Sequence, residues 1–210
     1  MAVRDEKQFN PTYQQACAYL SDLDDDWSLI IERIGPCGLE PKITEEPYER
    51  LIRAIAHQQL HGRAAEAILK RFLALFPESK FPEPQQILSI ESDIIRKCGF
   101  SMRKINTIKA IAEATLYDHV PTFAQAQKLS NDELIHKLTV LPGVGPWTVE
   151  MLLIFNLGRL DVLPVHDFGI REGYKRMKSL DKQPMPKELA KLGEPWSPYR
   201  SIASWYLWRA

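Results

Sequence analysis

The stretch LPGVGPWT, Leu141–Thr148, constrains the fold of this chain more than any other segment. Two glycines and two prolines interrupt a pattern in which apolar residues otherwise recur at the spacing of a helix face. Strand-like alternation of apolar and polar residues is nearly absent from the 210 residues. The sequence therefore predicts an all-α fold in which this stretch is a tight connection between two helices.

Proline, serine and glutamate mark the starts of several expected helices. Pro47 and Pro146 suit the first turn of a helix, because proline lacks the amide proton that would stay unbonded there. Ser101 can cap a helix, and Ser130 with Glu133 forms the capping box S-x-x-E. We expect helices from Pro47 to the stretch HQQLHG, beyond Gly62, after Ser101, over about 131–140, from Pro146, from near Asp167 to about Met177, and in the terminal segment YRSIASWYLWRA.

Gly143 and Gly145 give the connection backbone freedom and leave room beside it. Glycine adopts angles closed to other residues, and without a side chain it lets another backbone come close. The amides of Val144, Gly145 and the turn after Pro146 are then expected to point outward at the positive end of a helix dipole, where a phosphate diester would bind. An ordinary glycine-bearing helix connection is the alternative that spacing alone allows.

The composition is that of an ordinary globular protein, with 45% hydrophobic and 26% charged residues. No basic region followed by an apolar run opens the chain, and no stretch approaches the roughly 18 apolar residues of a membrane helix. We therefore expect a cytosolic location, or a nuclear one in a eukaryote. Cys17, Cys37 and Cys98 are widely spaced and predict free thiols rather than a disulfide framework, a zinc site or an iron-sulfur site.

Charge is distributed unevenly along the chain, although the net charge is zero. A zero net charge argues weakly against a nucleic-acid partner, since Lys and Arg drive phosphate binding. However, SDLDDDW near residue 24 is acidic, and residues 171–210 hold nine Lys or Arg against four Asp or Glu, a local excess of +5. One side of the molecule could therefore meet an anion, although solvated helix faces explain the same pattern.

Several stretches, in order along the chain, resemble one known family. ELIHKLTVLPGVGPWTVEMLLIF and the following DVLPVHDFGIR resemble the helix-hairpin-helix and downstream aspartate of the HhH-GPD DNA glycosylase superfamily, and within it the compact yeast-type members of the DNA-3-methyladenine glycosylase II family. LIRAIAHQQLHGRAA, CGFSMRKINTIKAIAEA and PYRSIASWYLW extend the resemblance from about residue 45 to the C-terminus. It implies a two-lobed helical fold, with 1–45 and 161–210 in one lobe and 46–160, which contains the helix-hairpin-helix at about 131–155, in the other.

The resemblance implies a base-excision repair enzyme that flips alkylated purines, such as 3-methyladenine and 7-methylguanine, out of double-stranded DNA and hydrolyses the N-glycosidic bond to leave an abasic site. In this family the essential carboxylate opens the helix after the hairpin, a position that Asp167 holds here. Cleavage builds positive charge on the deoxyribose, which a nearby carboxylate stabilises. From the residues alone, a simple N-cap explains Asp167.

Trp147 stands where family members that also cut the DNA backbone carry a lysine, which forms a Schiff base with the sugar. Tryptophan has no amine, so the resemblance implies a monofunctional enzyme that uses water as the nucleophile. Large aromatic faces suit a flipped, positively charged base. The base pocket implied in this way comprises Trp147, Met151, Phe168, Trp205 and Trp208. Which of the two last tryptophans faces the pocket stays open, and a buried core position is the alternative for Trp147.

The resemblance also assigns residues that would contact DNA. The backbone contacts would come from Leu141, Gly143, Val144, Gly145 and Thr148. The side chain that fills the gap left by the flipped base maps to Gln59, Leu60 or His61, with His61 or Gln59 preferred. A polar helix end is the alternative for these three residues.

Two further positions have expected roles. His166 would orient Asp167 or line the substrate groove, and a simply exposed histidine is the alternative. Arg200 is expected to be structural and to pair with a buried acid.

The resemblance finally implies several absences. This compact version lacks the mixed α/β lobe of bacterial members and the four-cysteine iron-sulfur run of another branch, so we expect no cofactor and no metal ligated by side chains. In relatives an alkali ion sits among hairpin carbonyls and bridges to phosphate. The expected partner is double-stranded DNA with alkylated bases, bound by a monomer. Two rival hypotheses are a non-catalytic helix-hairpin-helix protein that binds DNA or senses damage, and a helical protein-interaction scaffold.

Overall fold

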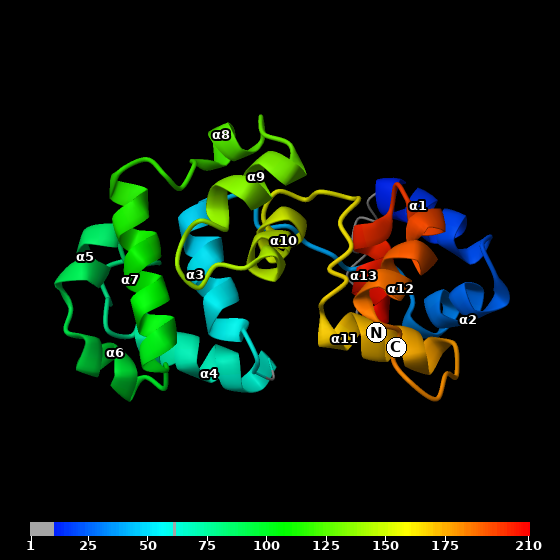
Figure 1. The fold of residues 1–210 in the computed structure, drawn as a ribbon, viewed down its shortest axis with the longest axis horizontal. Coiled ribbons are helices and arrows are strands. Elements are labelled where there is room, and N and C mark those ends of the chain that lie inside the picture. The colour runs from blue at the N-terminus through cyan, green and yellow to red at the C-terminus, as the bar shows by residue number, and fades with distance from the viewer. Residues whose placement is uncertain (1–10, 61) are drawn as a thin grey trace, which may run out of the picture. The chain divides into compact units, whose positions relative to one another are not determined.

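The computed structural model describes residues 11–60 and 62–210, and within these ranges every regular element is a helix (Figure 1). This confirms the predicted all-α class. None of the described helices is both long and apolar enough to cross a membrane. Contacts divide the chain into two compact units. The central unit is Pro41–Gly158, and the terminal unit combines the segment that ends at Glu40 with Arg159–Ala210.

The central unit is built around α3, which packs against α4, α7 and α10. Ile52 and Ile55 of α3 and Ile105 and Ile108 of α7 are fully buried. Each buried side chain of this kind stabilises the fold by about 1.5–3 kcal/mol relative to an exposed one. The helices of this unit are α3 (Pro47–His57), α4 (Gly62–Leu73), α5 (Pro84–Ser89), α6 (Ser92–Lys97), α7 (Met102–Leu116), α8 (Phe123–Ala126), α9 (Asn131–Leu138) and α10 (Pro146–Phe155).

Helix α10 is apolar apart from Thr148 and Glu150, and most of its residues are buried. Such a helix has to be surrounded by the rest of its unit. At its C-terminal end, Asn156 donates through Nδ2 to the carbonyls of Lys42 and Glu45, both at 2.8 Å. The connection between α9 and α10 is therefore attached to a helix that is fixed in the core of the central unit.

The terminal unit is built around α13, in which every residue from Ser201 to Leu207 is buried. Helix α11 crosses α13 so closely that a Cβ added at Gly173 would overlap the carbonyl oxygen of Leu207. The backbone contact therefore requires glycine on α11. The helices of this unit are α1 (Pro11–Ser21), α2 (Asp25–Ile34), α11 (Phe168–Met177), α12 (Pro186–Leu192), the 3-10 helix η1 (Glu194–Trp196) and α13 (Arg200–Leu207).

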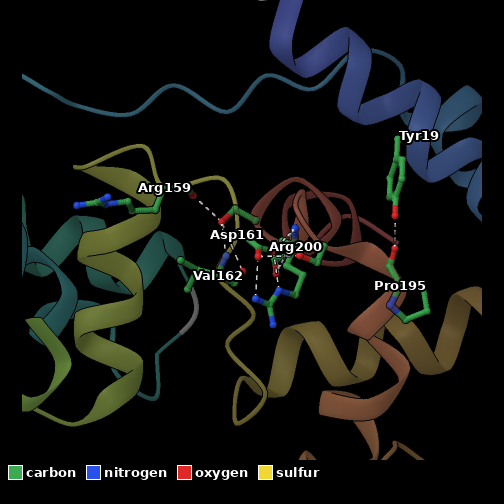
Figure 2. A network of polar contacts seen from close by, with 9 residues as sticks. Tyr19, Arg159, Asp161, Val162, Pro195 and Arg200 are labelled. Atoms are coloured by element: carbon green, nitrogen blue, oxygen red, sulfur yellow. Dashed lines mark hydrogen bonds and ion pairs between the residues drawn. The ribbon is translucent and has the colours of Figure 1, made fainter. Parts of the chain in front are cut away.

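A polar network holds the segment after Arg159 against the start of α13 (Figure 2). Arg200 donates to both carboxylate oxygens of Asp161, from Nε at 2.6 Å and from Nη2 at 2.8 Å. Ser201 donates to the carbonyl of Arg159 at 2.6 Å and accepts from the amide of Val162 at 3.0 Å. Arg200 therefore pairs with an acid, Asp161, as predicted, but the prediction that this acid is buried is wrong, because the Asp161 side chain is 31% exposed.

The acidic and basic stretches of the sequence meet within the terminal unit. Lys178, at the end of α11, donates to Asp24 at 2.7 Å and to Asp26 at 2.9 Å. Lys175 and Arg176 lie within 4.0 Å of Glu172. Part of the local excess of positive charge is therefore neutralised inside this unit.

Most predicted helix starts are confirmed. Pro47 and Pro146 open α3 and α10, and Ser101 caps α7 through its side chain. Ser130 and Glu133 form the capping box of α9, with bonds of 2.7 and 3.2 Å between each side chain and the other residue's amide. Local sequence signals are sufficient here because a cap involves only neighbouring residues.

Candidate functional site

The hairpin turn, residues 139–145, connects α9 to α10 in the central unit. Val144 donates its amide to the carbonyl of Leu141 at 3.1 Å, which closes the turn. Gly143 has a φ of +80°. A Cβ added there would overlap Oγ1 of Thr107 on α7. Gly143 is therefore required both by its backbone angle and by the close approach of α7.

Gly145 differs from Gly143 and from what the sequence suggested. Its φ of −99° and ψ of 172° are extended angles that any residue adopts, and a Cβ added there would meet no atom within 4 Å. Neither its backbone angles nor its neighbours in the structure therefore require glycine at this position. The open space is the room that an approaching ligand backbone would need.

One of the amides that the sequence predicted to point outward from the hairpin turn is bonded within the turn instead. The Val144 amide is used inside the turn, because it bonds to Leu141. Within the described part of the chain, nothing accepts from the amides of Gly143 and Gly145. The Gly145 amide belongs to the N-cap of α10, where the helix dipole is positive, and the Gly143 amide lies two residues earlier in the turn, so both are donors suited to an anion.

Thr148 supports the hairpin turn from inside the unit. It is buried, its amide donates to Gly145, and its hydroxyl accepts from Nε2 of Gln58 at 2.9 Å. The same Nε2 lies 3.3 Å from the carbonyl oxygen of Gly143. Gln58 therefore joins the hairpin turn to the end of α3.

The wedge loop, Gln58–Leu60, follows α3 and leads toward α4. Gln59 has a φ of +55°, in the left-handed region that non-glycine residues rarely adopt. Gln59 and Leu60 are both exposed. His61, the third predicted wedge residue, lies outside the described residues.

Lys104 of α7 contacts the main chain at the end of α3 and at the start of the wedge loop. Its Nζ donates to the carbonyl of Ala56 at 2.9 Å and to that of Gln58 at 2.8 Å. Burial lowers the pKa of Lys104 below its usual value, because the charge is partly removed from water.

Asp167 is the N-cap of α11 in the terminal unit. Its Oδ1 accepts from the amide of Ile170 at 2.9 Å and from the indole Nε1 of Trp208 at 3.0 Å. A Cβ added at Gly169 would lie 3.0 Å from Cδ1 of Trp208 and 3.1 Å from Oδ1 of Asp167. The absence of a side chain at residue 169 therefore lets the indole reach the carboxylate.

Trp208 and Trp205 have different surroundings, although they lie on the same helix end. Trp205 is 6% exposed, its ring lies 3.8 Å below the guanidinium of Arg209, and it packs edge-on against Tyr206. Trp208 contacts Asp167. Of the two tryptophans, Trp208 is the one that stands beside the carboxylate.

The other predicted pocket residues are divided between the units. Trp147 and Met151 lie one turn apart on α10 in the central unit, with Trp147 half-buried and Met151 buried. Phe168 of the terminal unit follows Asp167 directly and is 67% exposed. His166 is exposed, and within the described ranges it makes no hydrogen bond or ion pair.

The cysteines and acids form no metal site among the described residues. Cys17, Cys37 and Cys98 are free thiols, and no cluster of three or more His, Cys, Asp or Glu side chains in those ranges could hold a metal ion.

Several residues that shape the site were missed in the sequence. Gln58, Thr107 and Gly169 act through partners that are distant in the chain or through close packing. Lys104 could have been noticed in the sequence, because it falls in the first turn of an expected helix, where the helix dipole disfavours a cation. That signal indicates a partner elsewhere without identifying it.

Comparison with known proteins identifies similar chains over the whole length of the sequence. A family model described as HhH-GPD superfamily base excision DNA repair protein matches residues 52–198. DNA-3-methyladenine glycosylase 1 of Schizosaccharomyces pombe is 43% identical over 99% of this chain and 91% of its own. The alkylbase DNA glycosidase-like protein mag2 of the same organism is 38% identical over 94% of this chain and 93% of its own.

A solved structure is similar in fold as well. The 3-methyladenine DNA glycosylase Mag1 of Schizosaccharomyces pombe, solved in complex with abasic DNA, superposes with a TM-score of 0.89 and 45% identity over 93% of this chain and 95% of that one.

Proposed function

The chain belongs to the HhH-GPD superfamily of base excision DNA repair proteins, and from this membership we propose that it is a monofunctional DNA glycosylase that removes alkylated purines. The observation that carries the proposal is the position of Asp167, an N-cap carboxylate fixed by the Ile170 amide and the Trp208 indole. A carboxylate held in one orientation is what stabilisation of a sugar cation requires.

The proposed reaction is hydrolysis at C1′ of the deoxyribose. As the bond from C1′ to the base nitrogen breaks, its electron pair leaves with the base and positive charge develops on the sugar, which the Asp167 carboxylate stabilises. Water bonds to C1′ and its proton passes to the solvent, which leaves an abasic site. A purine that alkylation has made cationic is a good leaving group, so little acid catalysis is needed.

Trp147 supports the monofunctional assignment. The family places a lysine there in members that cut the DNA backbone, and the indole cannot form a Schiff base. We expect no covalent complex when the protein is treated with borohydride in the presence of damaged DNA. A borohydride-trapped complex would overturn the monofunctional assignment.

Trp147 and Met151 of the central unit, and Phe168 and Trp208 of the terminal unit, are each proposed to contact the flipped base. Aromatic faces attract a cationic purine by cation–π interaction. His166 is exposed, which favours contact with DNA over orientation of Asp167. Trp205 was expected as a pocket residue too, and its burial beneath Arg209 favours a packing role.

The hairpin turn is proposed to hold a phosphate of double-stranded DNA through the amides of Gly143 and Gly145. The carbonyls of this turn fit the alkali ion implied by the family, because hard cations prefer oxygen ligands and a carbonyl oxygen that accepts one hydrogen bond retains a second lone pair. The carbonyls of Leu141 and Gly143 would hold such an ion, whose positive charge would attract a phosphate oxygen. The bound form is proposed to be a monomer, in the compartment that holds the DNA.

Replacing Asp167→Asn tests the mechanism. Asparagine is also a good N-cap, so α11 should be retained while the negative charge is lost. We expect release of methylated bases from methylated DNA to fall by about 100-fold or more, with unchanged affinity for an abasic duplex. Absence of base release by the wild type, or undiminished release by the variant, would contradict the mechanism and favour a non-catalytic DNA-binding protein.

A panel of duplexes with single lesions tests the substrate range. It should contain 3-methyladenine, 7-methylguanine, hypoxanthine and ethenoadenine, each measured for base release. We expect the two cationic bases to be released fastest, because their bond to the sugar is already weakened. Faster release of the neutral bases would replace alkylated purines as the proposed substrate class.

A further inference from the structure

The wedge loop and the hairpin turn both contact the same helix, α7, the loop through a hydrogen bond and the turn through close packing. In the chain, Gln58 and Gly143 are 85 residues apart. In the central unit, Lys104 of α7 contacts the loop, and Thr107, one turn further along α7, lies directly beneath Gly143. The two segments proposed to contact DNA thus share one support.

Lys104 completes the end of α3. The last carbonyls of a helix have no partner within the helix and lie at the negative end of its dipole. The Lys104 ammonium supplies charge-assisted donors to two backbone carbonyls there, those of Ala56 and Gln58. Lys104 belongs to the first turn of α7, where the helix dipole disfavours a cation. Its charge therefore stabilises the C-terminal end of α3 rather than its own helix.

The carbonyl that Lys104 holds belongs to the residue before Gln59. Gln59 has a left-handed backbone, which a non-glycine residue keeps only where the surrounding contacts enforce it. Lys104 fixes the main chain at Gln58, and the Gln58 side chain fixes that residue to Thr148. Directly after this doubly anchored residue, Gln59 and Leu60 are exposed.

We propose that Lys104 is a positioning residue for base flipping, which keeps the exposed wedge loop at a set distance from the hairpin turn. This inference rests on the proposed function. Flipping a paired base costs free energy, and a side chain inserted into the stack offsets that cost. The offset is largest when the inserting loop is ordered before DNA binds, because less conformational entropy is then lost.

The test compares two duplexes that differ in the cost of flipping. One carries 7-methylguanine paired with cytosine, and the other carries 7-methylguanine in a single-nucleotide bulge, where no pair has to be broken. We expect Lys104→Met to lower the single-turnover rate of base release about tenfold on the paired duplex and less than about threefold on the bulge. Lys104→Arg, which keeps a charged donor, should restore most of the rate on the paired duplex.

Lys109→Met is the matched control. Lys109 also lies on α7 and also donates to a backbone carbonyl, that of Ile90 at 2.7 Å, but its partner is not in the wedge loop. Its loss should leave the ratio of paired to bulged rates as in the wild type. If Lys104→Met does not fold, Lys104→Gln, which keeps an uncharged donor, should give a smaller shift of the same ratio.

Three results would overturn the inference while the wild type remains active. They are an equal loss on both duplexes, wild-type rates on both, and the same change of ratio in Lys109→Met. An inactive wild type on both duplexes would instead overturn the proposed function itself.

Discussion

The indole Nε1 of Trp208 donates to Oδ1 of Asp167 at 3.0 Å, and the Ile170 amide donates to the same oxygen at 2.9 Å. The N-cap bond alone fixes the carboxylate relative to its own helix. The indole bond adds an anchor from the C-terminal end of α13, 41 residues away. The orientation of Asp167 therefore depends on the packing of α11 against α13.

Replacing Trp208→Phe removes this anchor and keeps an aromatic ring. We expect base release to fall about tenfold, as for the loss of a hydrogen bond to a charged group worth about 1.5 kcal/mol, with little change in affinity for an abasic duplex. Single-turnover rates and fluorescence anisotropy measure the two effects. Trp205→Phe is the control, because Trp205 is a core residue. Equal rate losses in both variants would mean that the indole bond has no part in the reaction.

Gly143 and Gly145 should respond differently to substitution. Gly143→Ala forces a side chain into Thr107 at a positive φ, so we expect a loss of about 2–4 kcal/mol in the free energy of unfolding. Gly145→Thr meets open space and keeps a favourable N-cap, so stability should stay within about 0.5 kcal/mol. Its side chain would occupy the space proposed for a phosphate, and affinity for an abasic duplex should fall at least about tenfold. Urea unfolding and anisotropy measure these effects, and tight DNA binding by Gly145→Thr would remove the hairpin turn from the proposed interface.

Gly173→Ala should be among the most destabilising single changes in the terminal unit. Its Cβ would overlap the backbone of Leu207, which cannot move aside as a side chain can. We expect a loss of at least about 3 kcal/mol in the free energy of unfolding, measured by thermal or urea unfolding. Gly62→Ala is the control, because a Cβ there meets nothing within 4 Å and alanine favours a helix. Retention of wild-type stability by Gly173→Ala would show that α11 and α13 separate without cost.

The pair of Asp161 and Arg200 should make stability depend on pH in acid. Hydrogen bonding from Arg200 holds the pKa of Asp161 below its ordinary value of 3.8. The contribution of this pair to the free energy of unfolding is therefore fully present above pH 3.8, where Asp161 is ionised in the unfolded chain as well. It is lost as the pH falls through the lower pKa that Asp161 has in the folded protein. Asp161→Asn should cost about 1 kcal/mol in the free energy of unfolding at pH 7, given the partial exposure of the pair.

The difference between the wild type and Asp161→Asn should be constant from about pH 5 to 8 and shrink below the ordinary Asp pKa, near pH 4. Urea unfolding at a series of pH values measures it. A difference that grows as the pH falls would contradict the assignment of the ion pair.

The sequence was sufficient for features that depend on neighbouring residues. The start of α9 follows from Ser130 and Glu133, and the N-cap position of Asp167 follows from its place before an apolar helical pattern. It was insufficient where a partner is distant in the chain. The close contact with Thr107 explains why residue 143 is glycine, and the residues near 143 in the sequence do not reveal that contact. The choice between Trp205 and Trp208 likewise depends on the tertiary packing around α13.

Helix α7 also sets the distance between the point where it contacts the wedge loop and the point where it contacts the hairpin turn. Lys104 and Thr107 are three residues apart, and a helix rises 1.5 Å per residue, so their attachments are spaced about 4.5 Å along its axis. Substitutions can weaken either attachment, but they cannot lengthen this spacing. A one-residue insertion between them would rotate one side chain by about 100° away from the other. A descendant of this protein could therefore change how far the loop stands from the hairpin turn only by gaining or losing residues within α7, and most such changes would detach one of the two.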